Sequence, residues 1–176
     1  MTSFTDRMFR AAKLDAALYE EVESDRNATG QAMGVVVLSA LAAGLGHFGK
    51  PGLAGPIAMV IASLVSWAIG AGVIWVVGTK LLPEEGTKSD VGELLRTLGF
   101  ASAPGMIRIF EIVPGLRWLV VVVAIVWTAA AMVLAVRQAL DYRSTVRAVV
   151  VVLIGTFLYG GIMRVVEVLV MRHAGA

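Results

Sequence analysis

The sequence has no cysteine and few charged residues. Of its 176 residues, 16% are charged, whereas soluble proteins carry about 25%. The lack of cysteine excludes a disulfide scaffold, a thiolate metal site and a cysteine nucleophile. Hydrophobic residues make up 58% of the chain, and the mean hydropathy is +0.82. This composition is typical of an integral membrane protein, and five spans of about 20 residues each leave little chain for a separate catalytic domain.

Long apolar runs separate the charged residues. Ionised side chains are costly in the centre of a membrane, so the gaps between them mark candidate spans. Runs that must satisfy their own backbone hydrogen bonds in lipid form α-helices, whereas barrel strands would alternate polar and apolar residues. The predicted spans cover approximately residues 29–47, 54–79, 91–113, 117–137 and 146–171.

The third predicted span, residues 91–113, is the least regular. Pro104 in its middle lacks the amide hydrogen that a helix interior uses. The segment can cross the membrane if its charged side chains reach the two interfaces and the helix is kinked at Pro104 and Gly105. The alternative is a re-entrant or interfacial segment. The predicted fold is thus an all-α transmembrane bundle with five spans, or with four spans and a re-entrant segment. The charged residues of this segment are Glu93, Arg96, Arg108 and Glu111.

The basic residues place the N-terminus in the cytoplasm, because cytoplasmic loops carry the excess of lysine and arginine. Ten of the 15 basic residues lie inside with five spans, and eleven with four, so charge does not decide the number of spans. We expect a bacterial cytoplasmic membrane protein. The inside set for five spans is Arg7, Arg10, Lys13, Arg26, Lys80, Lys88, Arg96, Arg137, Arg143 and Arg147.

Residues 1–28 are predicted to be a cytoplasmic helical segment that precedes the bundle of residues 29–173. Its first half places Phe4, Met8 and Ala11 on one helical face beside basic residues, a pattern typical of a helix on an anionic membrane surface. Its second half carries acidic residues that such a surface would repel. This half is either a solvated connector that folds back on the helix ends or a docking surface for a partner. The acidic residues are Glu20, Glu21, Glu23 and Asp25.

Small residues recur at a spacing of four in the first two predicted spans. Because lipid gives no hydrophobic drive for helix association, close backbone approach through small residues is a main source of helix contacts. The pattern predicts packing within the bundle, with a homodimer face on the second span as the alternative. The candidate packing residues are Gly30, Gly34, Gly44, Gly46, Ser66, Gly70 and Gly72.

Two pairs of opposite charge lie in predicted spans. Arg108 and Glu111 are three residues apart in the third, and Arg164 and Glu167 repeat this spacing in the last. Such residues can pair on one helix face, and pairing or snorkelling is enough to explain them. If the third and fifth helices pack together, the four side chains form one polar network. A small-solute or proton path would then be the alternative function.

Other motifs do not indicate a ligand. Residues 44–49 match the dinucleotide pattern G-x-G-x-x-G, but they end an apolar helix, where the helix dipole repels phosphate. His47 and His173 are the only histidines and lie near membrane edges, so haem, pigment or metal is not expected. No nucleophile or paired-carboxylate set is visible, and the net charge of +2 reflects topology rather than a nucleic-acid surface. We expect no enzyme activity, cofactor, metal, nucleotide or nucleic acid.

Three stretches of the chain carry a resemblance to a known family: residues 14–46, residues 99–104 and residues 141–149. They resemble prokaryotic Yip1-domain membrane proteins. The acidic juxtamembrane helix and Gly/Ala-rich first span of that family are matched by LDAALYEEVESDRNATGQAMGVVVLSALAAGLG. Gly99, Phe100 and Pro104 are similar to the Gly-aromatic-xxx-Pro signature of the third span. The basic hinge before the final helix is matched by DYRSTVRAV. The resemblance covers residues 14–171 and implies five transmembrane helices with a cytosolic N-terminus.

The sequence departs from the eukaryotic members of that family, which work in vesicle traffic with small GTPases. Their aspartate-leucine-tyrosine-glycine-proline motif is not present, and the N-terminal tail is far shorter, so this partner is not expected here. The function we hypothesise is a non-enzymatic membrane scaffold or accessory subunit. Its expected partners are the lipid bilayer and the helices of other membrane proteins or of a second copy.

Overall fold

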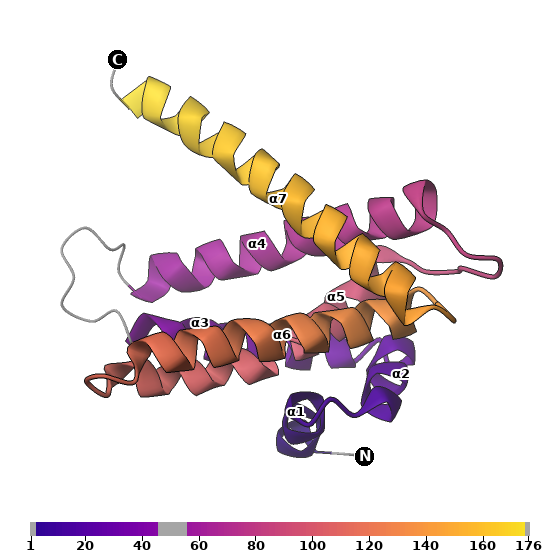
Figure 1. The fold of residues 1–176 in the computed structure, drawn as a ribbon, viewed down its shortest axis with the longest axis horizontal. Coiled ribbons are helices and arrows are strands. Elements are labelled where there is room, and N and C mark those ends of the chain that lie inside the picture. Colours follow the sequence, from indigo (N-terminus) through magenta and orange to yellow (C-terminus); the bar gives the residue numbers. More distant parts are fainter. Residues whose placement is uncertain (1–2, 46–55, 175–176) are drawn as a thin grey trace.

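The computed structural model describes residues 3–45 and 56–174 (Figure 1). This part of the chain consists of helices and the turns between them, and it contains no β-strand. The prediction of an all-α helical bundle is confirmed.

Four helices in the described part are long and apolar enough to cross a membrane. Their outward side chains form the large exposed apolar surface that marks a membrane-embedded protein; Phe157, for example, is 81% exposed. The four helices are α3 (Ala28–Leu45), α4 (Pro56–Val76) with its extension η1 (Val77–Leu81), α6 (Arg117–Ala139) and α7 (Thr145–Ala174).

Helix α5 (Val91–Phe100) begins the third predicted span. Its first turn is fixed by a capping box, in which the side chain of Asp90 accepts the amide of Glu93 and the side chain of Glu93 accepts the amide of Asp90. Two amides that the helix start would leave unpaired are thereby satisfied. Glu93, an acidic residue within the third predicted span, therefore caps the start of the helix at the boundary of that span.

The third predicted span continues as the 3-10 helix η2 (Ala103–Ile112), after a turn that follows Phe100. Pro104 lies in the first turn of η2, where its missing amide removes no hydrogen bond of the helix. The prediction of one helix kinked at Pro104 and Gly105 is wrong in this detail. The chain breaks before the proline, and the second half is wound more tightly than an α-helix.

Together α5 and η2 run along the bundle beside α3 and α6 (Figure 1). A rise of about 1.5 Å per residue in α5 and about 2.0 Å in η2 gives a combined length of about 35 Å, which exceeds the hydrocarbon core of about 30 Å. The five elements α3, α4, α5–η2, α6 and α7 alternate in direction (Figure 1). The bundle is thus built from four continuous helices and one broken element of similar reach.

The N-terminal helices α1 (Phe4–Ala12) and α2 (Ala16–Ser24) pack against the side of this bundle. The indole of Trp127 in α6 donates a 2.8 Å hydrogen bond to the carbonyl of Ala12. The apolar face of α1 therefore packs on protein, which corrects the expectation that it lies on lipid. The side chains that α1 and α2 bury completely are Ala11, Leu18, Tyr19 and Val22.

Arg7 holds the N-terminal helices in place. Its guanidinium donates to Glu21 and Asp25, both at 2.9 Å, and to Gln31 of α3 at 3.0 Å. The hydrogen bond from Arg7 holds the pKa of Asp25 below its ordinary value. The acidic second half thus folds back on the bundle, and its charges neutralise a basic residue that had been expected to face anionic lipid. Arg10 likewise donates hydrogen bonds to Asp15 and Glu21.

The end of α4 is fixed by the turn between α6 and α7. Gly78 in η1 lies directly against Leu140. The hydroxyl of Tyr142 lies 2.8 Å from the carbonyl oxygen of Gly78 and 2.7 Å from that of Leu82. It therefore partners carbonyls that the helix end leaves unsatisfied.

Candidate functional site

A cavity of about 1050 Å³ lies between α3, α4, α6 and α7, with the α5–η2 turn on its inner side. Helix α7 crosses α4 where Gly155 meets Ile74; a Cβ atom on Gly155 would lie 2.8 Å from Cγ1 of Ile74. Beyond this crossing α7 diverges from the other helices (Figure 1). The divergence opens the cavity sideways, toward the surroundings of the bundle.

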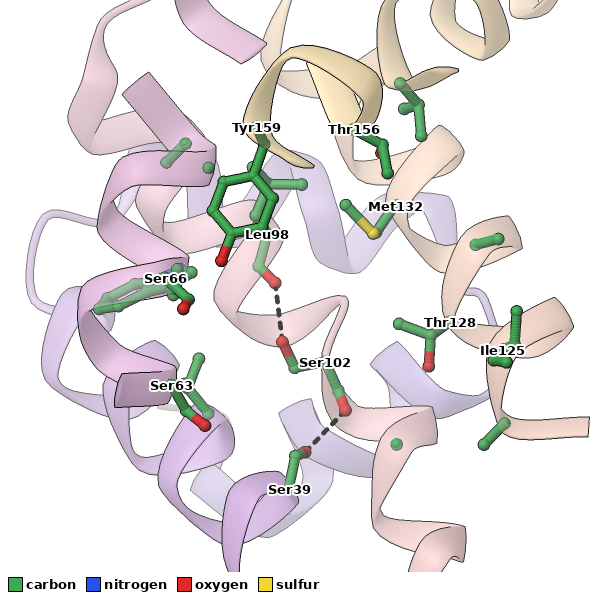
Figure 2. Close-up of a pocket in the computed structure, with 18 of the residues that line it drawn as sticks. Ser39, Ser63, Ser66, Leu98, Ser102, Ile125, Thr128, Met132, Thr156 and Tyr159 are labelled. Atoms are coloured by element: carbon green, nitrogen blue, oxygen red, sulfur yellow. Dashed lines mark hydrogen bonds between the residues drawn. The ribbon is translucent and has the colours of Figure 1, made fainter. Parts of the chain in front are cut away.

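The wall of the cavity is apolar with hydroxyl groups set into it (Figure 2). Ser39 donates a 2.7 Å hydrogen bond to the carbonyl of Ser102, and the hydroxyl of Ser102 donates to Leu98. The other hydroxyls make no hydrogen bond within the described residues, and an unpartnered hydroxyl in apolar surroundings is unfavourable. They are free to bind a polar group that enters the cavity: Ser63, Ser66, Thr128, Thr156 and Tyr159.

One end of the cavity is basic. Arg108 lines this end, and its Nε donates to Oε1 of Glu111 at 2.5 Å. The side chain of Glu111 is fully buried, and the Nε of Arg117 lies 4.0 Å from its other oxygen. Two guanidinium groups therefore flank one carboxylate, and the formal charge of the three side chains together is +1. This end of the cavity favours an anion.

The second predicted pair, Arg164 and Glu167, is formed with a distance of 2.7 Å but lies on the diverging part of α7. Its side chains are 81% and 45% exposed. Helix α7 packs mainly on α4 and α6 rather than on the third segment. The condition for one four-residue network is therefore not met, and only Arg108 and Glu111 belong to the cavity.

Some of the predicted packing glycines do make close contacts. Gly34 faces the ring of Phe4, and a Cβ atom placed on Gly34 would lie 3.5 Å from the nearest ring atom. Gly44 faces the sulfur of Met59 in the same way at 3.6 Å. Gly34 therefore packs against α1 rather than against another membrane-spanning helix. Gly99, which belongs to the family-like motif, makes a still closer contact, with Ala32 of α3.

The other predicted packing positions are open. No atom outside the helix lies within 4 Å of a Cβ atom placed on Gly30, Gly70 or Gly72. Ser66 and Gly70 line the cavity, whereas Gly72 lies on another face of α4. The remaining motif residues Phe100 and Pro104 are buried. Gly46, His47 and most of the G-x-G-x-x-G pattern lie outside the described residues, as does the side chain of His173.

A second groove, of about 580 Å³, lies on this other face of α4, where α7 crosses it. Gly72 provides its smallest residue, and apolar side chains form the rest. We call it the outer groove. Its lining residues are Ile69, Gly72, Val73, Trp75, Val76, Val77, Leu158 and Ile162.

Sequence reasoning missed the role of Arg96. It was expected to reach the membrane interface, but its Nε donates to the carbonyl of Val22 at 2.9 Å and its guanidinium bonds the carbonyl of Glu23. It therefore satisfies the C-terminal carbonyls of α2 and ties that helix to α5. Burial, then Asp141 and the other nearby carboxylates, raises the pKa of Glu23 to about 8.

Sequence reasoning also missed the cavity hydroxyls. A usable signal was present, since Ser63 and Ser66 are three residues apart in one helix, as are Thr156 and Tyr159 in another. That spacing places each pair on one helix face. Within residues 3–45 and 56–174, no three acidic or histidine side chains gather to hold a metal ion.

The comparisons with known proteins gave one match. The family model described as Yip1 domain matches residues 17–165, which include all of α2 except its first residue and every residue that lines the cavity. No curated protein and no solved structure matches the chain.

Proposed function

The chain belongs to the Yip1 domain family of membrane proteins, and from this premise we propose that it is a non-enzymatic scaffold or accessory subunit. It acts by binding the helices of another membrane protein or of a second copy. It resides in the bacterial cytoplasmic membrane with its N-terminus on the cytoplasmic side.

The observation that carries this proposal is the outer groove. Gly72 leaves space at its centre, and the flanking side chains Val76, Leu158 and Ile162 are 44%, 40% and 42% exposed. In a membrane, a helix gains stability from a neighbour by close van der Waals packing, which a glycine between apolar side chains allows. The groove therefore suits a transmembrane helix as its occupant.

Photo-cross-linking tests the proposal. A benzoylphenylalanine at Val76 is irradiated in native membranes and should give a product of defined mass, which identifies the partner or a second copy. Gly72→Leu fills the groove and should remove at least nine tenths of the product. Gly70→Leu is the matched control, because the same change on the same helix points into the cavity and should leave the product unchanged.

Two results would count against the groove as a docking site. One is a product from Val76 no stronger than that from Val126, an exposed position on α6. The other is a product that survives Gly72→Leu. Gly72→Leu and Gly70→Leu each add a side chain where no atom outside the helix lies within 4 Å of the new Cβ atom, so we expect both variants to fold.

A small-solute or proton transporter is the second candidate. The hydroxyl-lined cavity with Arg108 and Glu111 at one end favours it, because polar side chains inside a membrane protein often mark a solute path. The double variant R108Q/E111Q removes both charges together and so leaves no unpaired carboxylate. Unchanged proton flux in reconstituted vesicles, with unchanged growth under solute stress, would exclude this candidate.

A further inference from the structure

The basic end of the cavity lies at the depth of lipid headgroups. Arg117 begins α6, and the next residue, Trp118, is 75% exposed. Tryptophan beside arginine at a helix end is typical of the membrane–water interface. Arg108 and Arg117 meet around Glu111 at this level, so the mouth of the cavity is placed where a bilayer presents its phosphates.

From this mouth the cavity follows α6 inward. Its wall includes Val121, Ile125, Thr128 and Met132, which are successive turns of one helix face. At about 1.5 Å per residue, Val121 to Met132 spans about 16 Å, close to half of a hydrocarbon core of about 30 Å. The depth of the cavity therefore matches the acyl chains of one leaflet.

Polar groups occur in the order that a phospholipid requires. Gly105 lies beside Thr128, with 3.9 Å from a Cβ atom placed on Gly105 to the hydroxyl oxygen of Thr128. Arg108 is one turn of the 3-10 helix nearer the mouth, a distance of about 6 Å along the axis. Thr128 makes no hydrogen bond in the described part of the chain, so its hydroxyl can donate to an ester carbonyl below a phosphate that Arg108 binds.

We propose that the cavity binds one anionic phospholipid of the surrounding bilayer, with its phosphate at Arg108 and Arg117 and an acyl chain between α4, α6 and α7. The local charge of +1 favours a lipid with net negative charge over a zwitterionic one. Arginine can bind phosphate through two parallel hydrogen bonds, and Glu111 orients Arg108 for this. The sideways opening beyond the Gly155 crossing admits the chain from the bilayer. This proposal is independent of the outer groove.

Native mass spectrometry of the full chain, titrated with phosphatidylglycerol or phosphatidylcholine, tests the headgroup site. The wild-type protein should bind one phosphatidylglycerol about tenfold more tightly than phosphatidylcholine, the effect of one charge-assisted contact. Arg117→Gln removes the excess charge and should abolish this preference. It keeps the ion pair of Arg108 and Glu111. Arg164→Gln is the matched control, because it removes the same charge outside the cavity and should leave the preference unchanged.

Substitutions at Thr128 test the acyl-chain site. Thr128→Phe fills the cavity and should reduce binding of both lipids at least tenfold, whereas Thr128→Val keeps the volume and should cause a smaller loss. Gly72→Leu should have no effect, which separates this site from the outer groove. Equal binding of the two lipids by the wild-type protein, an equal loss in Arg117→Gln and Arg164→Gln, or full binding in Thr128→Phe would each overturn the proposal.

Discussion

Gly99 of α5 lies directly against Ala32 of α3: a Cβ atom on Gly99 would be 2.7 Å from the Cβ of Ala32. Real Cβ atoms do not approach so closely, so only glycine allows the two helices to cross at this distance. The next residue, Phe100, is completely buried, and the turn that follows it carries Ser102, which lines the cavity. The glycine of the family-like motif therefore has a packing role that its position in the sequence alone did not define.

Gly99→Ala is expected to destabilise the bundle. Overpacking a helix crossing costs about 1–3 kcal/mol, because the neighbouring backbone must shift. Adding Ala32→Gly to this variant should recover part of the lost stability, since it removes the methyl group that lies closest to the new Cβ atom. Unfolding followed by circular dichroism in detergent measures both effects. Gly30→Ala is the control, because nothing lies near its Cβ position; a loss in Gly99→Ala no larger than in this control would contradict the packing role.

Arg7→Gln is expected to loosen the N-terminal helices. The change removes charge-assisted hydrogen bonds to Glu21 and Asp25, and it leaves Asp25 without this cation, whereas Glu21 keeps its ion pair with Arg10. We expect a loss of about 2–3 kcal/mol for docking of α1 and α2. Hydrogen exchange read by mass spectrometry should show faster exchange in residues 4–24 and little change in α6. Lys13→Gln is the control, because it removes a positive charge at an exposed position of the same segment, and it should exchange like the wild type.

Glu23 is expected to make the stability depend on pH. Its pKa is raised to about 8 from 4.5, chiefly by burial, and one of its carboxyl oxygens accepts no hydrogen bond in the described part of the chain. The folded state therefore binds this proton more tightly than the unfolded state. The contribution to stability is complete below about pH 4.5 and is lost as the pH rises through 8.

Glu23→Gln imitates the protonated side chain and tests this dependence. The variant should melt about 2–4 °C higher than the wild type at pH 9, if about 1 kcal/mol is recovered, and at the same temperature at pH 5. Asp6→Asn is the control, because it removes an exposed carboxylate that is not among the groups that raise the pKa of Glu23. If the two variants respond alike at pH 9, the effect comes from overall charge rather than from the buried group.

The continuous helices could be predicted from the sequence because one physical requirement determines them. In lipid an uninterrupted apolar run has to pair its own amides and carbonyls, so its length alone indicates a spanning helix. The third segment could not be predicted in the same way. Hydrophobicity does not distinguish an α-helix from the 3-10 winding after Phe100, and Pro104 is compatible with a kink or with a new helix start.

The contacts of the N-terminal helices and the cavity depend on tertiary structure. The face with Phe4 and Met8 suits lipid and protein equally, so long-range contacts decide between them, among them the ion pairs of Arg7 with Glu21 and Asp25. These pairs join residues 14 and 18 positions apart, and no local pattern indicates them. The cavity depends on the divergence of α7 beyond Gly155, which follows from a crossing with α4 rather than from the composition of α7.

Residues 91–113 decide between four and five spans, and we predict that they cross the membrane. The combined reach of α5 and η2 and the alternating directions of the helices favour a crossing. The absence of cysteine allows single-cysteine reporters without removing native thiols. Glu85→Cys lies in the turn before α5 and Leu116→Cys in the turn after η2. If the segment crosses, a membrane-impermeant maleimide added to intact cells should label Leu116→Cys, and Glu85→Cys only after the membrane is opened. Labelling of both positions from the same side would show a re-entrant segment and reduce the bundle to four spans.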